Sequence, residues 1–68
     1  MNYFEQKSRQ IIDMINEGCT QEEIIDDLFD GVRNRYKTVM RKCFSADFRE
    51  KCGRKLAYNK MKANKKEN

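Results

Sequence analysis

Positive charge is concentrated in one short segment of the chain, VRNRYKTVMRKC, which spans residues 32–43. Five of its twelve residues are arginine or lysine, and an asparagine and a threonine stand among them. Arginine can form two hydrogen bonds with guanine and asparagine two with adenine, whereas lysine and arginine also neutralise phosphate groups. The residue types of this segment therefore suit contact with duplex nucleic acid.

The spacing of the same segment predicts an amphipathic helix. At 100° per residue its apolar side chains fall within an arc of about 100°, the width of a stripe that faces a core. The stripe consists of Val32, Tyr36, Val39, Met40 and Cys43. We predict base readout by the residues opposite the stripe, Asn34, Thr38 and Arg41. We predict phosphate contacts by the flanking residues and by two lysines further along: Arg33, Arg35, Lys37, Lys42, Lys55 and Lys60.

Three more helices are predicted to position this one. Phe4, Ile11 and Ile15 share a face of a helix over 3–17, which Gly18 ends. Thr20 and Glu23 have the spacing of a capping box, so a second helix should cover 20–29 and end at the turn-forming residues 30 and 31.

After the basic helix at 32–43, Ser45 is a candidate cap for a helix over 46–58, in which Phe48, Cys52 and Leu56 recur every four residues. The sequence thus predicts an all-α fold: a compact domain of three to four helices over 1–58, followed by a flexible basic tail over 59–68.

Charge divides the chain into two halves of opposite sign. Residues 1–31 hold two basic and eight acidic residues, a net of −6, and residues 32–68 hold thirteen basic and three acidic residues, a net of +10. Such asymmetry indicates one part that attracts polyanions and another that repels them. The basic face of a helix can also be only a solvated surface, and that reading stays open.

Two segments carry a resemblance to a known family. GCTQEEIIDDL, from 18 to 28, followed by RNRYKTVMRK, from 33 to 42, resembles the helix-turn-helix DNA-binding families, especially small regulators of phages and mobile elements. Thr20, Gln21, Ile24 and Leu28 fit the Thr- or Ser-Gln-x-x-Ile-x-x-x-Leu run of these families. The resemblance covers about 25 of the 68 residues. It implies sequence-specific binding of double-stranded DNA through 32–43, by a small transcriptional regulator or a DNA-architectural or excision factor.

A single small DNA-binding module has weak sequence specificity. We therefore expect a homodimer, in which the contact between the two copies comes from the first helix or from Phe48–Leu56. An alternative is a small protein that inhibits a nucleic-acid enzyme or regulator through an acidic face over 13–30 that imitates nucleic acid. The residues of that face are Glu22, Glu23, Asp26 and Asp27. RNA binding through the basic helix and tail is a third, weaker alternative.

The residue types and their spacing give little indication of catalysis, metal binding or membrane insertion. The chain has no histidine and no glycine-rich phosphate loop, so we predict no enzymatic activity. Cys19, Cys43 and Cys52 have no zinc-ligand spacing, so we predict no metal and no cofactor. No apolar run reaches the length of a membrane span, and the first ten residues lack the order of a signal peptide. We therefore expect a cytoplasmic protein, located at the nucleoid when bound to DNA.

Overall fold

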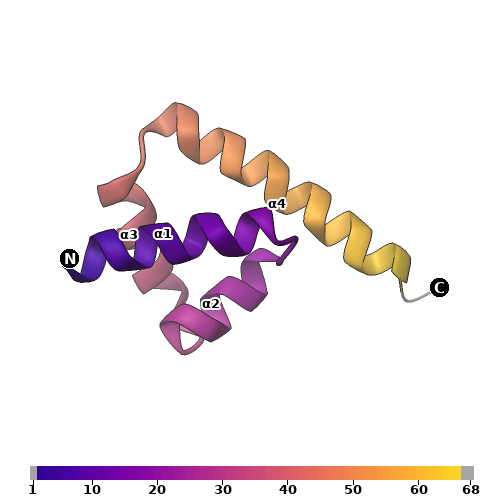
Figure 1. Cartoon of the computed structure of the whole chain (residues 1–68), viewed down its shortest axis with the longest axis horizontal. Coiled ribbons are helices and arrows are strands. Elements are labelled where there is room, and N and C mark those ends of the chain that lie inside the picture. Colours follow the sequence, from indigo (N-terminus) through magenta and orange to yellow (C-terminus); the bar gives the residue numbers. More distant parts are fainter. Residues whose placement is uncertain (1, 67–68) are drawn as a thin grey trace.

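Four helices joined by short loops make up the part of the chain that the structure, a computed structural model, describes: residues 2–66, with side chains for 2–64. The helices are α1 (Tyr3–Asn16), α2 (Gln21–Phe29), α3 (Arg33–Cys43) and α4 (Ala46–Lys66). No strand occurs among these residues, which confirms the predicted all-α class. Figure 1 shows α1 crossing in front of α3, with α2 below it and α4 running across the top.

Side chains next to the helix ends explain where α1, α2 and α4 begin. Asn2 Oδ1 accepts from the backbone N–H of Glu5 at 2.8 Å, and Ser45 Oγ accepts from that of Phe48 at 3.2 Å. The predicted capping box is formed: Thr20 Oγ1 accepts from the Glu23 N–H at 3.2 Å, and Glu23 Oε1 accepts from the Thr20 N–H at 2.8 Å. Each cap satisfies an amide that the first turn leaves without a helical partner.

The turn between α2 and α3 depends on a left-handed backbone. Asp30, the C-cap of α2, has φ 52° and ψ 33°, and Gly31 has φ 81°. Aspartate and glycine tolerate this region better than other residues, which agrees with the turn predicted at 30–31. The chain reverses within residues 30–32, so that α3 contacts both α2 and α1.

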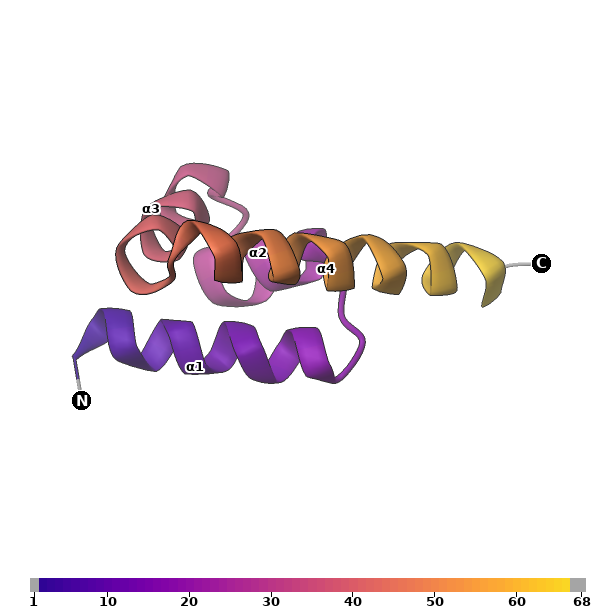
Figure 2. The same cartoon turned by 90° about the horizontal axis from the view of Figure 1, so that it is seen from above.

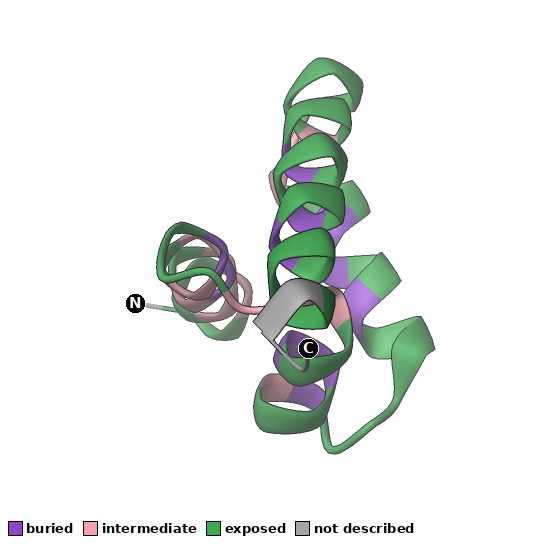
Figure 3. Cartoon of the chain, turned by 90° about the vertical axis from the view of Figure 1, so that its right-hand side faces the viewer, coloured by how far each residue is buried: buried purple, intermediate pink, exposed green. Residues whose placement is uncertain are grey.

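The core lies where the four helices face one another (Figure 3). Its buried apolar side chains are Ile11, Ile15, Ile24, Ile25, Phe29, Tyr36, Val39, Met40, Cys52 and Leu56. Phe29 and Tyr36 meet edge to face, with ring centroids 6.0 Å apart. The core-facing stripe predicted for 32–43 is confirmed at Tyr36, Val39 and Met40.

Two residues predicted to face the core do not. Val32 is 42% exposed because it precedes α3 with extended φ and ψ, so the helical periodicity does not reach it. Phe48 is 37% exposed and packs beside Phe44, with centroids 4.9 Å apart, at the open edge of the first turn of α4.

The last helix is longer than the sequence indicated. We predicted that it ends at 58 and that a flexible tail begins at 59, but α4 continues to Lys66. Asn59 is only 2% exposed, and its Nδ2 donates to the carbonyls of Ile15 at 3.0 Å and Cys19 at 2.9 Å. The domain boundary at 58 is therefore wrong, because residue 59 is part of the packed domain. Residues 67 and 68 of the predicted tail lie outside the described residues.

Beyond Asn59, α4 leaves the other helices. Both Figure 1 and Figure 2 show its C-terminal turns extending past α1, α2 and α3. All described side chains from Lys60 to Asn64 are exposed. We call residues 60–66 the α4 arm.

Candidate nucleic-acid interface

The outer face of α3 consists of the residues that the sequence singled out for nucleic-acid contact. Tyr36, Val39 and Met40 are 5%, 1% and 7% exposed and hold the helix against the core. All seven predicted contact residues of α3 are exposed: Arg33, Asn34, Arg35, Lys37, Thr38, Arg41 and Lys42. Because α3 contains no acidic residue, this face is uniformly basic and polar.

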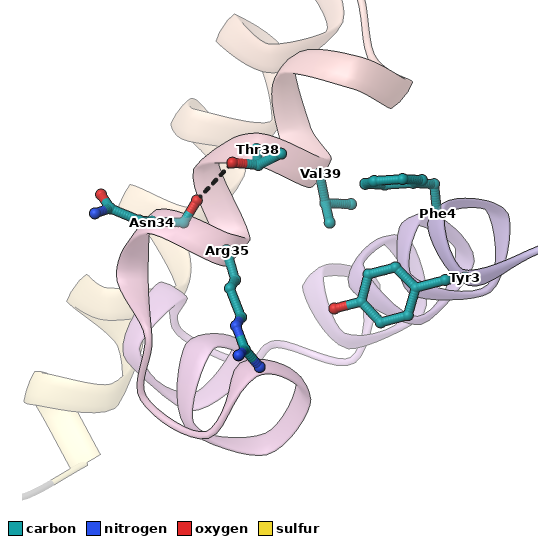
Figure 4. Close-up of a pocket in the computed structure, with 6 residues that line it drawn as sticks. All are labelled: Tyr3, Phe4, Asn34, Arg35, Thr38 and Val39. Atoms are coloured by element: carbon teal, nitrogen blue, oxygen red, sulfur yellow. Dashed lines mark hydrogen bonds between the residues drawn. The ribbon is translucent and has the colours of Figure 1, made fainter.

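One hydrogen bond restrains the side chain of Thr38 on this face. Thr38 Oγ1 donates to the backbone carbonyl of Asn34 at 2.9 Å (Figure 4). The hydroxyl hydrogen of Thr38 is thereby used within the helix, so the oxygen can only accept further hydrogen bonds. The amide of Asn34 makes no bond to another described side chain and extends outward in the same view.

A groove of about 430 Å³ separates the beginning of α1 from one flank of α3. Its lining residues are Tyr3, Phe4, Asn34, Arg35, Thr38 and Val39. Figure 4 shows the phenol of Tyr3 and the guanidinium of Arg35 directed toward the same open space. Tyr3 is 50% exposed, and its hydroxyl can donate to an anion as the Arg35 guanidinium does.

Contacts at the far end of this groove hold α1 beside α3. Cys43 Sγ donates to the carbonyl of Phe4 at 3.5 Å, and Lys42 Nζ lies 4.9 Å from the centroid of the Phe4 ring. No role was predicted for Tyr3, although two adjacent aromatic residues at the start of a helix were an available signal. The groove adds Tyr3 to the predicted site.

The opposite flank of α3 is less positive. Arg33 Nη2 lies 3.2 Å from Glu22 Oε2 of α2, and the two side chains are 53% and 60% exposed. An ion pair so accessible to water contributes little to stability, so Arg33 can exchange Glu22 for another anion. While the pair is formed, the charge of Arg33 is partly balanced, whereas no acidic partner of Arg35 occurs among the described residues.

Lys55 and Lys60 are not brought to the outer face of α3. Lys55 borders a small hollow between α4 and α1, together with Ile12 and Asn16, and its Nζ lies 5.1 Å from the centroid of the Tyr58 ring. Lys60 lies on the other side of α4, beside Thr20 and Glu22 of α2. Neither lysine shares a surface with Asn34 or Arg41, so their predicted phosphate contacts would be separate from those of α3.

The acidic residues of α2 form a second exposed surface. Ile24, Ile25 and Phe29 are buried, and the predicted acidic residues are all exposed: Glu22, Glu23, Asp26 and Asp27. This acidic surface lies opposite the buried side of α2 and reaches α3 at one edge, where Glu22 pairs with Arg33.

The buried ionisable groups favour their neutral forms. Burial raises the pKa of the Cys52 thiol, and it raises the pKa of the Tyr36 phenol with smaller contributions from Cys52 and Glu22. Burial also raises the pKa of Cys19, and the nearby carboxylates of Glu23, Glu17 and Asp27 act in the same direction. A thiol whose pKa is raised is a poor nucleophile and metal ligand near neutral pH.

Within residues 2–66, no three cysteine or acidic side chains come close enough to hold a metal ion. None of the described helices is long and apolar enough to cross a membrane. Comparison with known proteins identifies no relative: no family model, no curated protein and no solved structure matches the chain.

Proposed function

We propose that the chain binds double-stranded DNA through α3, with α2, the turn at 30–32 and α3 acting as a helix-turn-helix unit. The observation that carries the proposal is the outer face of α3, where five cations, one asparagine and one threonine are exposed while three apolar residues bury the opposite side. An α-helix with its side chains is about 10–12 Å in diameter and fits the major groove, which is about 12 Å wide, and the 11 residues of α3 give it a length of about 16 Å.

Within this proposal the residues of α3 divide by position. Asn34, Thr38 and Arg41 are opposite the buried side and reach base edges, where asparagine suits adenine and arginine suits guanine. Arg35, Lys37 and Lys42 contact phosphates on the flanks, as does Arg33 once it leaves Glu22. The groove beside α1 receives the sugar-phosphate strand next to Arg35, with the hydroxyl of Tyr3 as a further donor. The biological role that fits is that of a small transcriptional regulator or a DNA-architectural or excision factor.

A homodimer on two half-sites remains part of the proposal, because one helix specifies only a few base pairs. Of the predicted dimer contacts, Leu56 is 6% exposed and packs inside its own chain. Phe48 keeps an exposed edge beside Phe44 and is the better candidate.

Selection from a random duplex pool at near-physiological salt tests DNA binding directly. The expected result is one enriched motif, and a palindromic motif would indicate a dimer. Asn34→Ala and Arg41→Ala should each weaken discrimination at one base position by about 5- to 150-fold, the equivalent of 1–3 kcal/mol. Asn64→Ala and Arg9→Ala are matched controls, since both residues are exposed and lie outside α3.

A phosphate contact should behave differently from a base contact. Lys37→Ala should weaken binding to all sequences alike and reduce the slope of log K against log salt by about 1. Retention of DNA without an enriched motif would leave α3 as a phosphate-binding surface only. If Asn34→Ala and Arg41→Ala both keep the base preference of the parent, the assignment of base readout is wrong.

The acidic surface of α2 supports the second candidate, inhibition of a nucleic-acid enzyme or regulator by imitation of DNA. Asp26 and Asp27 are exposed and have no cation within 4.0 Å among the described residues. Reversing both charges should abolish binding to such a basic partner and leave DNA retention intact. Loss of both activities, or of neither, counts against this candidate.

A further inference from the structure

A hollow of about 410 Å³ lies between α4 and the end of α1. Figure 1 and Figure 2 both show α4 passing the loop that joins α1 to α2 at this point. Sites for small molecules in proteins usually have a volume of about 300–1,000 Å³. No residue of α3 lines the hollow, so it is separate from the proposed DNA interface. We call it the loop hollow; its charged lining residues are Glu17, Glu23, Lys55 and Lys62, and Tyr58 and Asn59 line it as well.

The acidic and basic groups of the loop hollow do not pair with one another. Both ion pairs among the described residues, Arg33–Glu22 and Arg54–Glu50, lie elsewhere, so neither lysine of the hollow has one of its carboxylates within 4.0 Å. The two lysines instead approach the ring of Tyr58, with distances of 5.1 and 5.5 Å from Nζ to the centroid. Unpaired charges of both signs therefore border the same space.

The wall formed by α1 and α2 is negative. Glu17 follows the last residue of α1, and because the last turn of α1 contains no basic residue, the negative end of the helix dipole adds to its charge. Glu23 uses Oε1 to accept from the Thr20 N–H, which leaves Oε2 available. Burial raises the pKa of the Cys19 thiol, and Glu23 and Glu17 act in the same direction, so both carboxylates lie near this one loop residue. This wall suits an ammonium group.

Asn59 adds a buried acceptor whose orientation is fixed. The residue is 2% exposed, and its Nδ2 donates to the carbonyls of Ile15 and Cys19 at 3.0 and 2.9 Å, whereas no described group donates to its Oδ1. Among the described residues, Gln10 has the one fully buried side-chain oxygen without a partner, so Oδ1 of Asn59 is open to the hollow that this residue lines. Buried polar atoms of proteins nearly always have a hydrogen-bond partner. A ligand with an N–H donor would supply it.

We propose that the loop hollow binds a free α-amino acid, which carries an ammonium and a carboxylate group on the same carbon. The ammonium group donates to Asn59 Oδ1 and approaches Glu17 and Glu23. The carboxylate group is held by Lys55 and Lys62. A ligand with only a positive charge would meet the two lysines, and one with only a negative charge would meet the two glutamates, so a zwitterion fits better than either.

The remaining lining favours a small apolar side chain on the ligand. Tyr58 presents a ring that is 50% exposed, and Ala63 of the α4 arm presents a methyl group. Because the four charged side chains are exposed to water, each contributes little, and a dissociation constant on the order of 1 mM is expected. Binding requires no DNA, so the proposal does not rest on the proposed function.

Titration of the isotope-labelled full chain with L-leucine up to about 20 mM, without DNA and followed by amide NMR spectra, tests the proposal. The expected result is saturable shifts confined to the amides of residues 16–19 and 55–63 and of Glu23. N-acetyl-leucine lacks the ammonium group and leucinamide lacks the carboxylate group. Each should bind at least about tenfold more weakly than L-leucine, whereas glycine keeps both groups and should still bind.

Two variants of the chain test the two walls. Glu17→Gln and Lys62→Gln each remove one charge at nearly constant size and should weaken leucine binding by about threefold or more. Asp13→Asn and Lys60→Gln are matched controls, because both residues are exposed on the same helices and do not line the hollow. Their affinity should equal that of the parent, and the spectra verify that every variant is folded.

The proposal is overturned if neither L-leucine nor glycine produces saturable shifts. Equal binding of N-acetyl-leucine would identify an anion site at the lysines, and equal binding of leucinamide a cation site at the glutamates; either result contradicts a zwitterion site. A control variant that loses as much affinity as Glu17→Gln or Lys62→Gln would mean that the shifts depend on net charge and not on the hollow. DNA retention by α3 is measured separately, so failure of one proposal is distinguishable from failure of the other.

Discussion

Asn59 should be the most sensitive polar residue of the chain, and its replacement tests the packing of α4. Its side chain is 2% exposed and donates two hydrogen bonds to carbonyls of α1 and the following loop, at 3.0 and 2.9 Å. A typical intramolecular hydrogen bond contributes about 1 kcal/mol, and a buried carbonyl left without a donor costs about 1–3 kcal/mol. Asn59→Ala should therefore lower the free energy of unfolding by about 2–3 kcal/mol.

That loss is large for a chain of 68 residues, whose total stability is expected to be about 3–10 kcal/mol. Urea denaturation followed by circular dichroism at 222 nm measures it, and the thermal midpoint should fall by about 8–20 °C. Asn64→Ala is the matched control, because Asn64 is exposed on the same helix; its effect should stay within about 0.5 kcal/mol. Equal stability of the two variants would refute the anchoring role of Asn59.

Asn59→Asp distinguishes the lost donors from the lost volume. The carboxylate has nearly the same shape as the amide but cannot donate, and it would face two carbonyl oxygens. Burial and these carbonyls should raise the pKa of the new carboxyl in the folded state. This variant should therefore be less stable than Asn59→Ala at neutral pH and recover stability as the pH falls and the carboxyl regains a proton. A loss of stability independent of pH would mean that the hydrogen bonds matter less than the packing.

Three further predictions concern single sites, each measured by urea unfolding. Thr20→Ala removes the side-chain half of the capping box of α2 and should cost about 1 kcal/mol. Gly53→Ala should raise the free energy of unfolding by up to about 1 kcal/mol, because Gly53 is in a helix and nothing lies within 4 Å of the added methyl group. Gly18→Ala should lower the free energy of unfolding, because Gly18 has φ +95°. Burial raises the pKa of Cys52 and Tyr36 above their ordinary values of 9.0 and 10.0, so the folded state retains these protons longer than the unfolded state. Their contribution is complete below these ordinary values and is lost as the pH rises from about 9 through the folded pKa values. The urea midpoint should therefore fall as the pH rises above about 9, and an unchanged midpoint would contradict the prediction.

Local signals in the sequence were sufficient for the presence of the four helices and for the caps of α2 and α4, although not for the end of α4. The capping box at Thr20, the cap at Ser45 and the turn at Asp30 each depend on residues at most three positions apart, and the stripe of α3 depends on its own periodicity. Val32 shows the limit of this reasoning, because periodicity does not show where a helix begins.

Features that depend on distant contacts were not predictable. The carbonyls bound by Asn59 lie 44 and 40 positions earlier in the chain, and the surrounding lysines made its segment resemble a solvated tail. The same limit applies to the candidate site. Exposure of the seven α3 residues followed from the helical period, but the groove at Tyr3 depends on how α1 packs beside α3, and the pair Arg33–Glu22 joins two helices across 11 positions.

The acidic surface of α2 limits how the chain can approach a polyanion. The net charge of +4 attracts DNA only weakly, but the halves of −6 and +10 give the molecule a strong charge asymmetry. A polyanion would be repelled by α2 and attracted by α3, so the asymmetry would orient the encounter if the proposed DNA binding is correct.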